Sequence, residues 1–297
     1  ATEQDPLLPV ERLRVREQIL EIREDDLRFT ADEAAQLLNK QLNLNLDQAL
    51  IDTLTARTKG MALELLMAGL ALHGRADKAG LIESMVAGHH DLLADLIDAV
   101  IERQPEELQA FLQQTSILDL LYAPLCDVVV RGENSDDMLR EVQQAQLPVH
   151  VLDDTNEWLS YHPAFAARLR EQLGEGRSQA DIDGLHRRAS AWHAEHGSLT
   201  LAIRHALIIG NTGMAADFIE EAARHVMLQG QVETLTRWLD TLTPAQIELR
   251  PRLRIYRAWT LFVRDRIGEA EETLYEARAA IGSLTRSPAR TRLREEL

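Results

Sequence analysis

Apolar residues recur at the spacing of an α-helix along most of this chain. Between residues 61 and 73, leucine and methionine side chains stand three or four positions apart, which predicts a helix with one buried face. Helix starts are marked upstream of it. Thr30 followed by Glu33 has the spacing of a capping box, and Asp47 is the expected N-cap of a helix that ends at Gly60.

The middle of the chain has a different pattern. Two short apolar runs, 147–152 and 158–161, flank a polar cluster, which is the arrangement of a β-hairpin. The helix before the hairpin is expected to be capped by Ser135 or Asp136. A further helix is expected from Pro163, because proline suits a first helical turn. Helices followed by a single hairpin form the outline of a winged-helix domain.

The last third of the chain has helical periodicity alone. Gly230-Gln231-Val232-Glu233 is echoed 38 residues later by Gly268-Glu269-Ala270-Glu271, and helix pairs with such a period are typical of tetratricopeptide-like arrays. We therefore predict a mainly α protein with a helical part at 1–74, a winged helix at 75–175 and helical repeats at 176–297. The expected repeat helices are 178–196, 199–209, 212–229, 231–242, 251–264 and 268–282, followed by an arginine-rich helix that ends at Leu297.

Charge and composition narrow the possible functions. Of the 297 residues, 48 are acidic and 32 basic, so the formal charge is −16 and a nucleic-acid backbone would repel the chain. We therefore expect no direct contact with nucleic acid. A single cysteine, Cys126, can form no internal disulfide, no apolar run is long enough to span a membrane, and the first residues lack the pattern of a signal peptide. These features indicate a cytoplasmic protein with no membrane contact.

A series of short motifs runs along the chain. They are Asp5-Pro6-Leu7-Leu8-Pro9, Asp26-Leu27-Arg28-Phe29-Thr30, Arg57-Thr58-Lys59-Gly60, Thr115-Ser116-Ile117-Leu118, Pro124-Leu125-Cys126-Asp127, Tyr161-His162-Pro163-Ala164-Phe165 and Ala202-Ile203-Arg204-His205-Ala206-Leu207. In this order they resemble the large LuxR-type transcription regulators that are maltose-activator-like members of the signal-transduction ATPase class. Residues 1–29, which we interpret as a strand end, a turn and an amphipathic connector, are similar to the exit from the ATPase core of that family.

The resemblance implies an architecture and a role. In such regulators an ATPase is followed by a helical domain, a winged helix, a helical-repeat sensor and a helix-turn-helix, so this chain is expected to be the middle of one. It contains no Gly-x-x-x-x-Gly-Lys-Ser/Thr motif. The implied role is signal sensing and switching in a transcription activator. An inducer would bind the repeats, and the full-length protein would bind ATP or ADP and self-associate, while this segment alone would hold no cofactor.

The sequence departs from the family in three places. Glu3 stands where an arginine is usual near the γ-phosphate, and Thr58-Lys59-Gly60-Met61 stands where an acidic residue and a tryptophan are typical. Ser160 replaces an arginine before Tyr161-His162. Glu3, Met61 and the missing phosphate-binding loop favour an alternative function. In that alternative the chain is a free-standing helical-repeat adaptor that binds proteins and has no nucleotide switch.

One cofactor-binding candidate, His162, follows from the resemblance. In related switch ATPases a winged-helix histidine in a similar setting contacts the β-phosphate of ADP. The chemistry fits, because an imidazole N–H can donate to a phosphate oxygen and a helix start beside it favours anions. The structural alternative is a histidine that caps the following helix or packs beneath Tyr161.

Other chemistry-bearing residues favour structural interpretations. His186 and His193 share a helix face and could ligate a metal together with His196. No cysteine is near them, and Trp192 and Ala189 look like packing partners, so we expect no metal site.

Three further groups of residues also favour structural interpretations. Cys126 lies in an apolar run, as buried and inert thiols do, so we expect no catalytic residue and no enzyme activity. The arginines at 250, 252, 254 and 257 could face a nucleic acid, but their acidic neighbours favour a solvated helix face. Trp192, Trp238 and Trp259 are expected to pack between helices, the functional alternative being that one of them lines the groove where an inducer docks.

Overall fold

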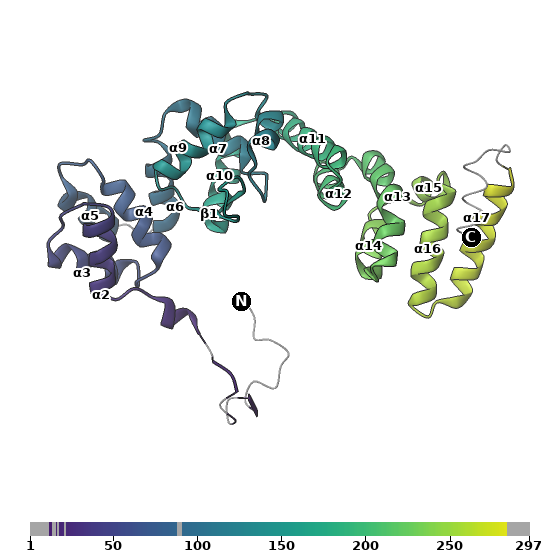
Figure 1. Cartoon of the computed structure of the whole chain (residues 1–297), viewed down its shortest axis with the longest axis horizontal. Coiled ribbons are helices and arrows are strands. Elements are labelled where there is room, and N and C mark those ends of the chain that lie inside the picture. The colour runs from purple at the N-terminus through teal and green to yellow at the C-terminus, as the bar shows by residue number, and fades with distance from the viewer. Residues whose placement is uncertain (1–11, 14–15, 17, 21, 88–90, 284–297) are drawn as a thin grey trace. The chain divides into compact units, whose positions relative to one another are not determined.

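The structure is a computed structural model that describes residues 12–13, 16, 18–20, 22–87 and 91–283. Figure 1 shows a chain built of helices with one small hairpin, which confirms the predicted fold class. The chain divides into two compact units, 1–109 and 110–297, which we describe separately. Glu3 and the arginine-rich segment 284–297 lie outside the described residues. No helix in the described part is long and apolar enough to cross a membrane.

Short helices make up the first unit. Both predicted caps are confirmed: Thr30 and Glu33 form a capping box on α2, and the Asp47 carboxylate accepts a hydrogen bond from Leu50 N (2.9 Å) on α3. The expected connector contains a short 3-10 helix. The elements are η1 (Glu24–Leu27), α2 (Ala31–Ala35), η2 (Gln36–Gln41), α3 (Gln48–Arg57), α4 (Ala62–Leu72), α5 (Lys78–Ala87) and α6 (Leu92–Ile101).

The α4–α6 contact forms much of the core of this unit. Leu65 of α4 and Ile97 of α6 are buried, and the two helices pack against each other. Just beyond α6, the Arg103 guanidinium donates to Leu70 O and Ala71 O, both at 3.0 Å. Carbonyl groups at the end of a helix have no partner within the helix, so this arginine satisfies the end of α4.

The departure from the family at residues 58–61 has a structural role. Gly60 has a φ of +72°, and a Cβ added there would lie 2.5 Å from Phe29 O, so only glycine fits. Phe29 N donates to Gly60 O at 2.8 Å. The buried Thr58 hydroxyl donates to Leu54 O at 2.8 Å, at the end of α3. This segment therefore closes α3 and ties it to the chain that precedes α2.

The predicted hairpin lies in the second unit. Strand β1 (Val149–Val151) pairs antiparallel with β2 (Leu159–Tyr161), and Leu121 forms an isolated bridge to β2. The strands are shorter than the two apolar runs. Helix α10 begins at Pro163, as predicted. The helices around the hairpin are α7 (Glu106–Thr115), which contains the boundary between the units, α8 (Ala123–Val130), α9 (Ser135–Gln144) and α10 (Pro163–Gly176).

The predicted cap of α9 is wrong. The N-cap is Asn134, and Ser135 is the first helical residue and is buried. Ser135 N donates to the Asp127 carboxylate at 3.0 Å. The acceptor for this amide thus comes from α8, eight residues upstream. The local sequence around Ser135 and Asp136 could not predict a contact with another helix.

From α10 to residue 283, where the described part of the chain ends, helices alone follow, and all six predicted ones are confirmed to within two residues at each end. Sequence analysis missed α15, although Thr243 and Gln246 form a capping box there. The helices are α11 (Gln179–Glu195), α12 (Leu199–Ile208), α13 (Thr212–Leu228), α14 (Val232–Asp240), α15 (Pro244–Glu248), α16 (Pro251–Val263) and α17 (Ile267–Ser283).

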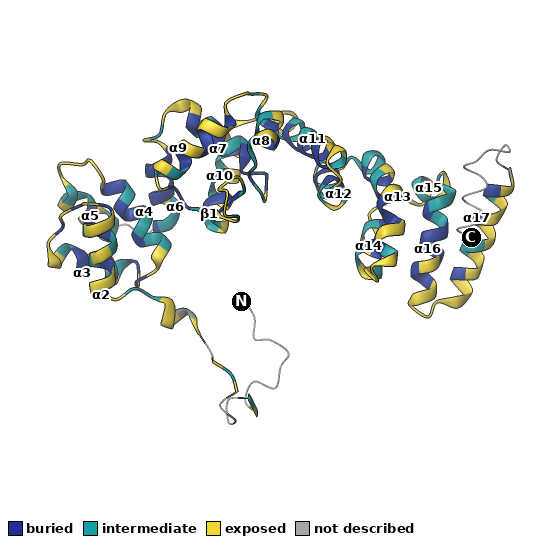
Figure 2. Cartoon of the chain, in the orientation of Figure 1, coloured by how far each residue is buried: buried dark blue, intermediate teal, exposed yellow. Residues whose placement is uncertain are grey.

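Neighbouring repeat helices share a core. Contacts join α11 to α12, α12 to α13, α13 to α14, and α16 to α13, α14 and α17. Ile219, Leu235, Leu239, Leu253 and Tyr256 are buried in one cluster that spans α13, α14 and α16. Figure 2 shows the buried residues aligned along these helices, whereas α17 is exposed over most of its length.

Candidate functional site

His162 stands where β2 ends and α10 begins. Its backbone N donates to Pro148 O at 2.8 Å, and its side-chain Nδ1 accepts from Ala164 N at 3.3 Å, so it is the N-cap of α10. Because Nδ1 is an acceptor, the neutral ring carries its proton on Nε2. The ring is half-buried and keeps an N–H donor at the N-terminus of a 14-residue helix.

A second histidine, His150, lies beside His162. It comes from β1, and the two ring centroids are 5.8 Å apart. Burial, and then the charge of His150, lower the pKa of His162 below its ordinary value, so the His162 ring is neutral at pH 7. Sequence analysis did not identify His150. The only signal for it is the strand register, in which His150 stands opposite Ser160, two positions before His162.

The backbone that carries His162 is firmly held. Tyr161, the preceding residue, is buried, and its hydroxyl shares a 2.7 Å hydrogen bond with Thr115 Oγ1. The Tyr161 ring also meets Phe165 edge to face, with centroids 5.8 Å apart. Arg170 of α10 donates to Ser116 O at 3.0 Å. These contacts fix the end of the hairpin to α10 and to the end of α7.

Aromatic rings join the winged helix to the first repeat helix. Tyr122, the N-cap of α8, stacks on Trp158 beside the hairpin, with centroids 4.6 Å apart and the planes at 7°. Tyr122 also meets Trp192 of α11 edge to face at 6.3 Å. The hairpin, α8 and α11 therefore share one aromatic contact chain.

Two arginines strengthen the same junction. Arg188 of α11 donates through Nε to Val129 O at 2.8 Å and also through Nη2, near the end of α8. Arg204 of α12 forms an ion pair with Asp119, and the hydrogen bond from this guanidinium lowers the pKa of that carboxyl. Helices α11 and α12 are thus hydrogen-bonded to the winged helix rather than merely adjacent to it.

The three histidines weighed as metal ligands are placed differently by the structure. His186 and His193 are buried together with a third residue, His205, and His196 instead stacks on Trp192. His186 Nδ1 and His205 Nδ1 lie 2.8 Å apart, and the His193 and His205 rings are stacked at 5.6 Å. The described part of the chain contains no group of three or more ligating side chains arranged to hold a metal ion.

Two of the four arginines considered as a nucleic-acid face, Arg250 and Arg257, form short ion pairs with carboxylates. Arg250 pairs with Asp217 (2.6 Å), and Arg257 forms an ion pair with Asp240. These partners lie on α13 and α14, so the two arginines join neighbouring helices. Their side chains are less exposed to solvent than we expected from the sequence. Cys126 is fully buried, and burial raises the pKa of its thiol to about 12.

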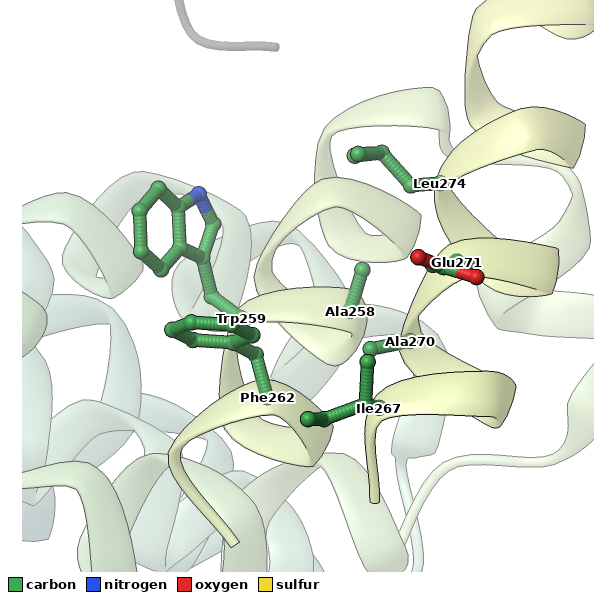
Figure 3. Close-up of a pocket in the computed structure, with 7 residues that line it drawn as sticks. All are labelled: Ala258, Trp259, Phe262, Ile267, Ala270, Glu271 and Leu274. Carbon is green, nitrogen blue, oxygen red and sulfur yellow. The ribbon is translucent and has the colours of Figure 1, made fainter. Parts of the chain in front are cut away.

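Of the three repeat-region tryptophans, one lines a pocket. Trp192 is 9% exposed and Trp238 packs against the repeat core, whereas Trp259 is 44% exposed. Trp259 and Phe262 meet edge to face on α16. Figure 3 shows the pocket between α16 and α17, with a volume of about 270 Å³; Ala258, Trp259, Phe262, Ile267, Ala270, Glu271 and Leu274 line it.

Comparison with known proteins identifies the winged helix. Residues 97–181 match the family described as the MalT winged helix domain. The transcriptional regulator MalT of Yersinia enterocolitica is 28% identical over 278 residues, which are 93% of this chain and 31% of MalT. MalT of Cronobacter sakazakii is 30% identical over 92% of this chain and 30% of its own length. The serine/threonine-protein kinase PknK of Mycobacterium tuberculosis is 33% identical over 93% of this chain and 25% of the kinase.

One solved structure has a similar fold. It is a signal transduction ATPase with numerous domains (STAND) and a tetratricopeptide repeat sensor, from Pyrococcus horikoshii. It aligns with a TM-score of 0.57 at 15% identity, over 84% of this chain and 35% of that protein. The chain spans about a quarter to a third of the length of these relatives. The resemblance found in the sequence is confirmed: the chain is similar to a segment of MalT-like STAND regulators, with a winged helix followed by tetratricopeptide-like helices.

Proposed function

We propose that this chain is the signal-sensing and switching segment of a cytoplasmic, LuxR-type transcription activator. In this proposal His162 contacts a phosphate of ADP held by the full-length protein, and an inducer binds the helical repeats. Inducer binding favours an open form, because the inducer has a higher affinity for that form. Opening then permits self-association, and a separate domain of the full-length protein binds DNA.

The observation that carries the proposal is the connection between His162 and the repeats. The donor at His162 Nε2 belongs to a hairpin whose end is held by Tyr161 and Arg170. The same domain is bonded to α11 and α12 through Arg188 and Arg204. A change in the repeats therefore has a short physical route to the nucleotide contact.

The residues present fit a phosphate. His162 Nε2–H can donate to a phosphate oxygen, and the N-terminus of α10 beside it favours a negative charge. When bound, ADP would supply the charge that this donor recognises. Since the pKa of His162 is lowered, the contact is a hydrogen bond from a neutral ring at pH 7 and not an ion pair.

Replacement of His162 in the full-length protein tests the proposal. We expect His162→Ser to lower ADP affinity about tenfold or more, the typical cost of losing one hydrogen bond to a charged group. Serine is a preferred N-cap, so this variant keeps the cap of α10 while it removes the reach of the imidazole. The matched control is His225→Ser, because His225 is exposed on α13 and distant in sequence from the winged helix. Isothermal titration with ADP gives both affinities.

Equal ADP affinity in the His162 and His225 variants would overturn the phosphate contact. If the unaltered full-length protein binds no ADP, the nucleotide switch is wrong as well, and the chain is then better described as a helical-repeat adaptor that binds proteins.

A further inference from the structure

Two polar residues share one face of the hairpin with His162. His150 stands directly opposite Ser160 in the strand register, and Ser160 is two positions before His162, so the three side chains face the same side. The His150 and His162 ring centroids are 5.8 Å apart. His150 is exposed, and Ser160 and His162 are half-buried. Within the described residues neither the His150 ring nor the Ser160 hydroxyl forms a hydrogen bond, so both can donate to a ligand.

Charged side chains on the surrounding elements are engaged with other partners. Those of known partners are Arg168, Arg170 and Glu171 of α10, Asp119 before α8, and Asp153 in the hairpin turn. The carboxylates of Asp154 and Glu157 also lie in the turn, at the opposite end of the hairpin from His162. The pKa of His162 is lowered by burial and then by the charge of His150, with no contribution from a carboxylate. An anion is therefore the partner that this pair of imidazoles lacks.

The two rings differ in where they can hold a proton. His162 Nδ1 accepts a hydrogen bond from Ala164 N at 3.3 Å, so a proton on this nitrogen would break the cap of α10. His162 therefore acts as a neutral donor through Nε2. The ring of His150 has no such bond and can carry a proton on both nitrogens. Histidine is the side chain that changes charge between pH 5 and 8, and a neighbouring anion favours its charged form.

We propose that His150 is a second phosphate-binding residue, which contacts the same phosphate of ADP as His162 and takes up a proton when that phosphate binds. The proposal rests on the proposed function, because it assigns a second contact to the same site. The proton comes from the solvent and is added to the His150 ring, which then donates a charge-assisted hydrogen bond to a phosphate oxygen. Because the bound state holds one more proton than the free state, the affinity for ADP rises as the pH falls.

The pH dependence of ADP binding to the full-length protein tests the role of His150. His150→Gln keeps an N–H donor on an exposed strand residue but cannot take up a proton. We expect the ratio of ADP affinities, unaltered protein to variant, to increase about fivefold between pH 8 and pH 6. The ionisation of ADP itself is common to both proteins and cancels in this ratio. The matched control is His225→Gln, at an exposed position of α13, which should keep the pH dependence of the unaltered protein.

Proton uptake gives a second, independent measurement. Calorimetric titration at pH 7 in two buffers of different ionisation enthalpy counts the protons bound with each ADP. We expect the His150→Gln variant to take up about half a proton less than the unaltered protein and the His225→Gln control. A residue that only supports the hairpin would change the affinity without changing this number.

Two results would overturn the proposal. One is an affinity ratio that is the same at pH 6 and pH 8, together with equal proton uptake in the His150 variant and the unaltered protein. If His162→Ser still weakens ADP binding in that case, the proposed function stands and the role of His150 alone is wrong. The other is a full-length protein that binds no ADP, which overturns the proposed nucleotide contact and this inference together.

Discussion

At the scale of single residues, the buried histidines of the first repeat depend on staying neutral. His186 and His205 share a 2.8 Å contact between their Nδ1 atoms, so one ring must donate and the other accept. His193 stacks on His205, and its own Nδ1 is buried with no hydrogen-bond partner in the described part of the chain. Burial lowers the pKa of all three, and that of His205 reaches about 3. The positive charge of Arg204 lowers the pKa of all three histidines further, whereas the negative charge of Asp119 raises the pKa of His193 and His205.

This arrangement makes the stability of the chain sensitive to acid. The unfolded chain takes up protons at these histidines near pH 6.5, and the folded chain does so only at lower pH. The free energy of unfolding is therefore greatest above pH 6.5 and falls as the pH drops towards 3. His205 alone should account for a loss of about 2 kcal/mol between pH 7 and 5. Urea unfolding at the two pH values measures the loss.

A matched pair of variants isolates the cause. His193→Phe keeps an aromatic ring beside His205 and costs no hydrogen bond of Nδ1, which has none in the described part of the chain. The variant removes one of the groups whose pKa is lowered by folding. The free energy of unfolding should therefore fall less between pH 7 and 5 than it does in the unaltered chain. His225→Phe, at an exposed position, should leave that loss unchanged. Equal pH dependence in the two variants would contradict the account of the histidine cluster.

The role of a single residue could be predicted from the sequence where it depends only on residues a few positions away. The caps at Thr30 and Asp47 follow from local spacing and were predicted. His205 was not identified as a partner of His186, because the contact joins residues 19 apart on different helices. His150 was missed for a similar reason: its place beside His162 depends on the strand register.

At the scale of elements, the junction between α8 and α11 rests on Arg188. Its guanidinium donates twice to Val129 O, near the end of α8, where a carbonyl has no partner inside the helix. Arg188→Met keeps the apolar stem and leaves this carbonyl without its donor. We expect a cost of roughly 1–3 kcal/mol in unfolding free energy. Amide hydrogen exchange should become faster at Arg131 and Gly132, whose N–H groups close the end of α8.

The neighbouring arginine provides the control. Arg187 is exposed on the same helix, so Arg187→Met removes the same charge without touching the junction. If both variants exchange at the rate of the unaltered chain, Arg188 does not hold α8 and α11 together.

Helices could be predicted from the sequence where they are long enough for their apolar residues to show a clear helical period. The six long repeat helices follow from apolar positions three and four apart, and their ends are marked by glycines such as Gly210 and Gly230. Helix α15 spans only five residues and buries none of them, so it offers no period to detect. Its capping box at Thr243 and Gln246 was the one available signal.

At the scale of the whole molecule, the order of motifs carried more information than any single one. The winged helix predicted at 75–175 overlaps the range 97–181 that matches the MalT winged helix domain. The exact limits of this domain stay a prediction. They are hard to derive from the sequence, because no local pattern marks the boundary between two helical domains. The charge of −16 pointed away from nucleic acid, and that expectation likewise stays a prediction.

The central claim is that this chain is the switching segment of a larger regulator. The most direct measurement is the nucleotide sequence of the gene on both sides of the region that encodes it. We predict a Gly-x-x-x-x-Gly-Lys-Ser/Thr motif upstream and a helix-turn-helix downstream in the same reading frame. A start codon immediately before Ala1 and a stop codon after Leu297 would contradict the claim and leave the adaptor function in its place.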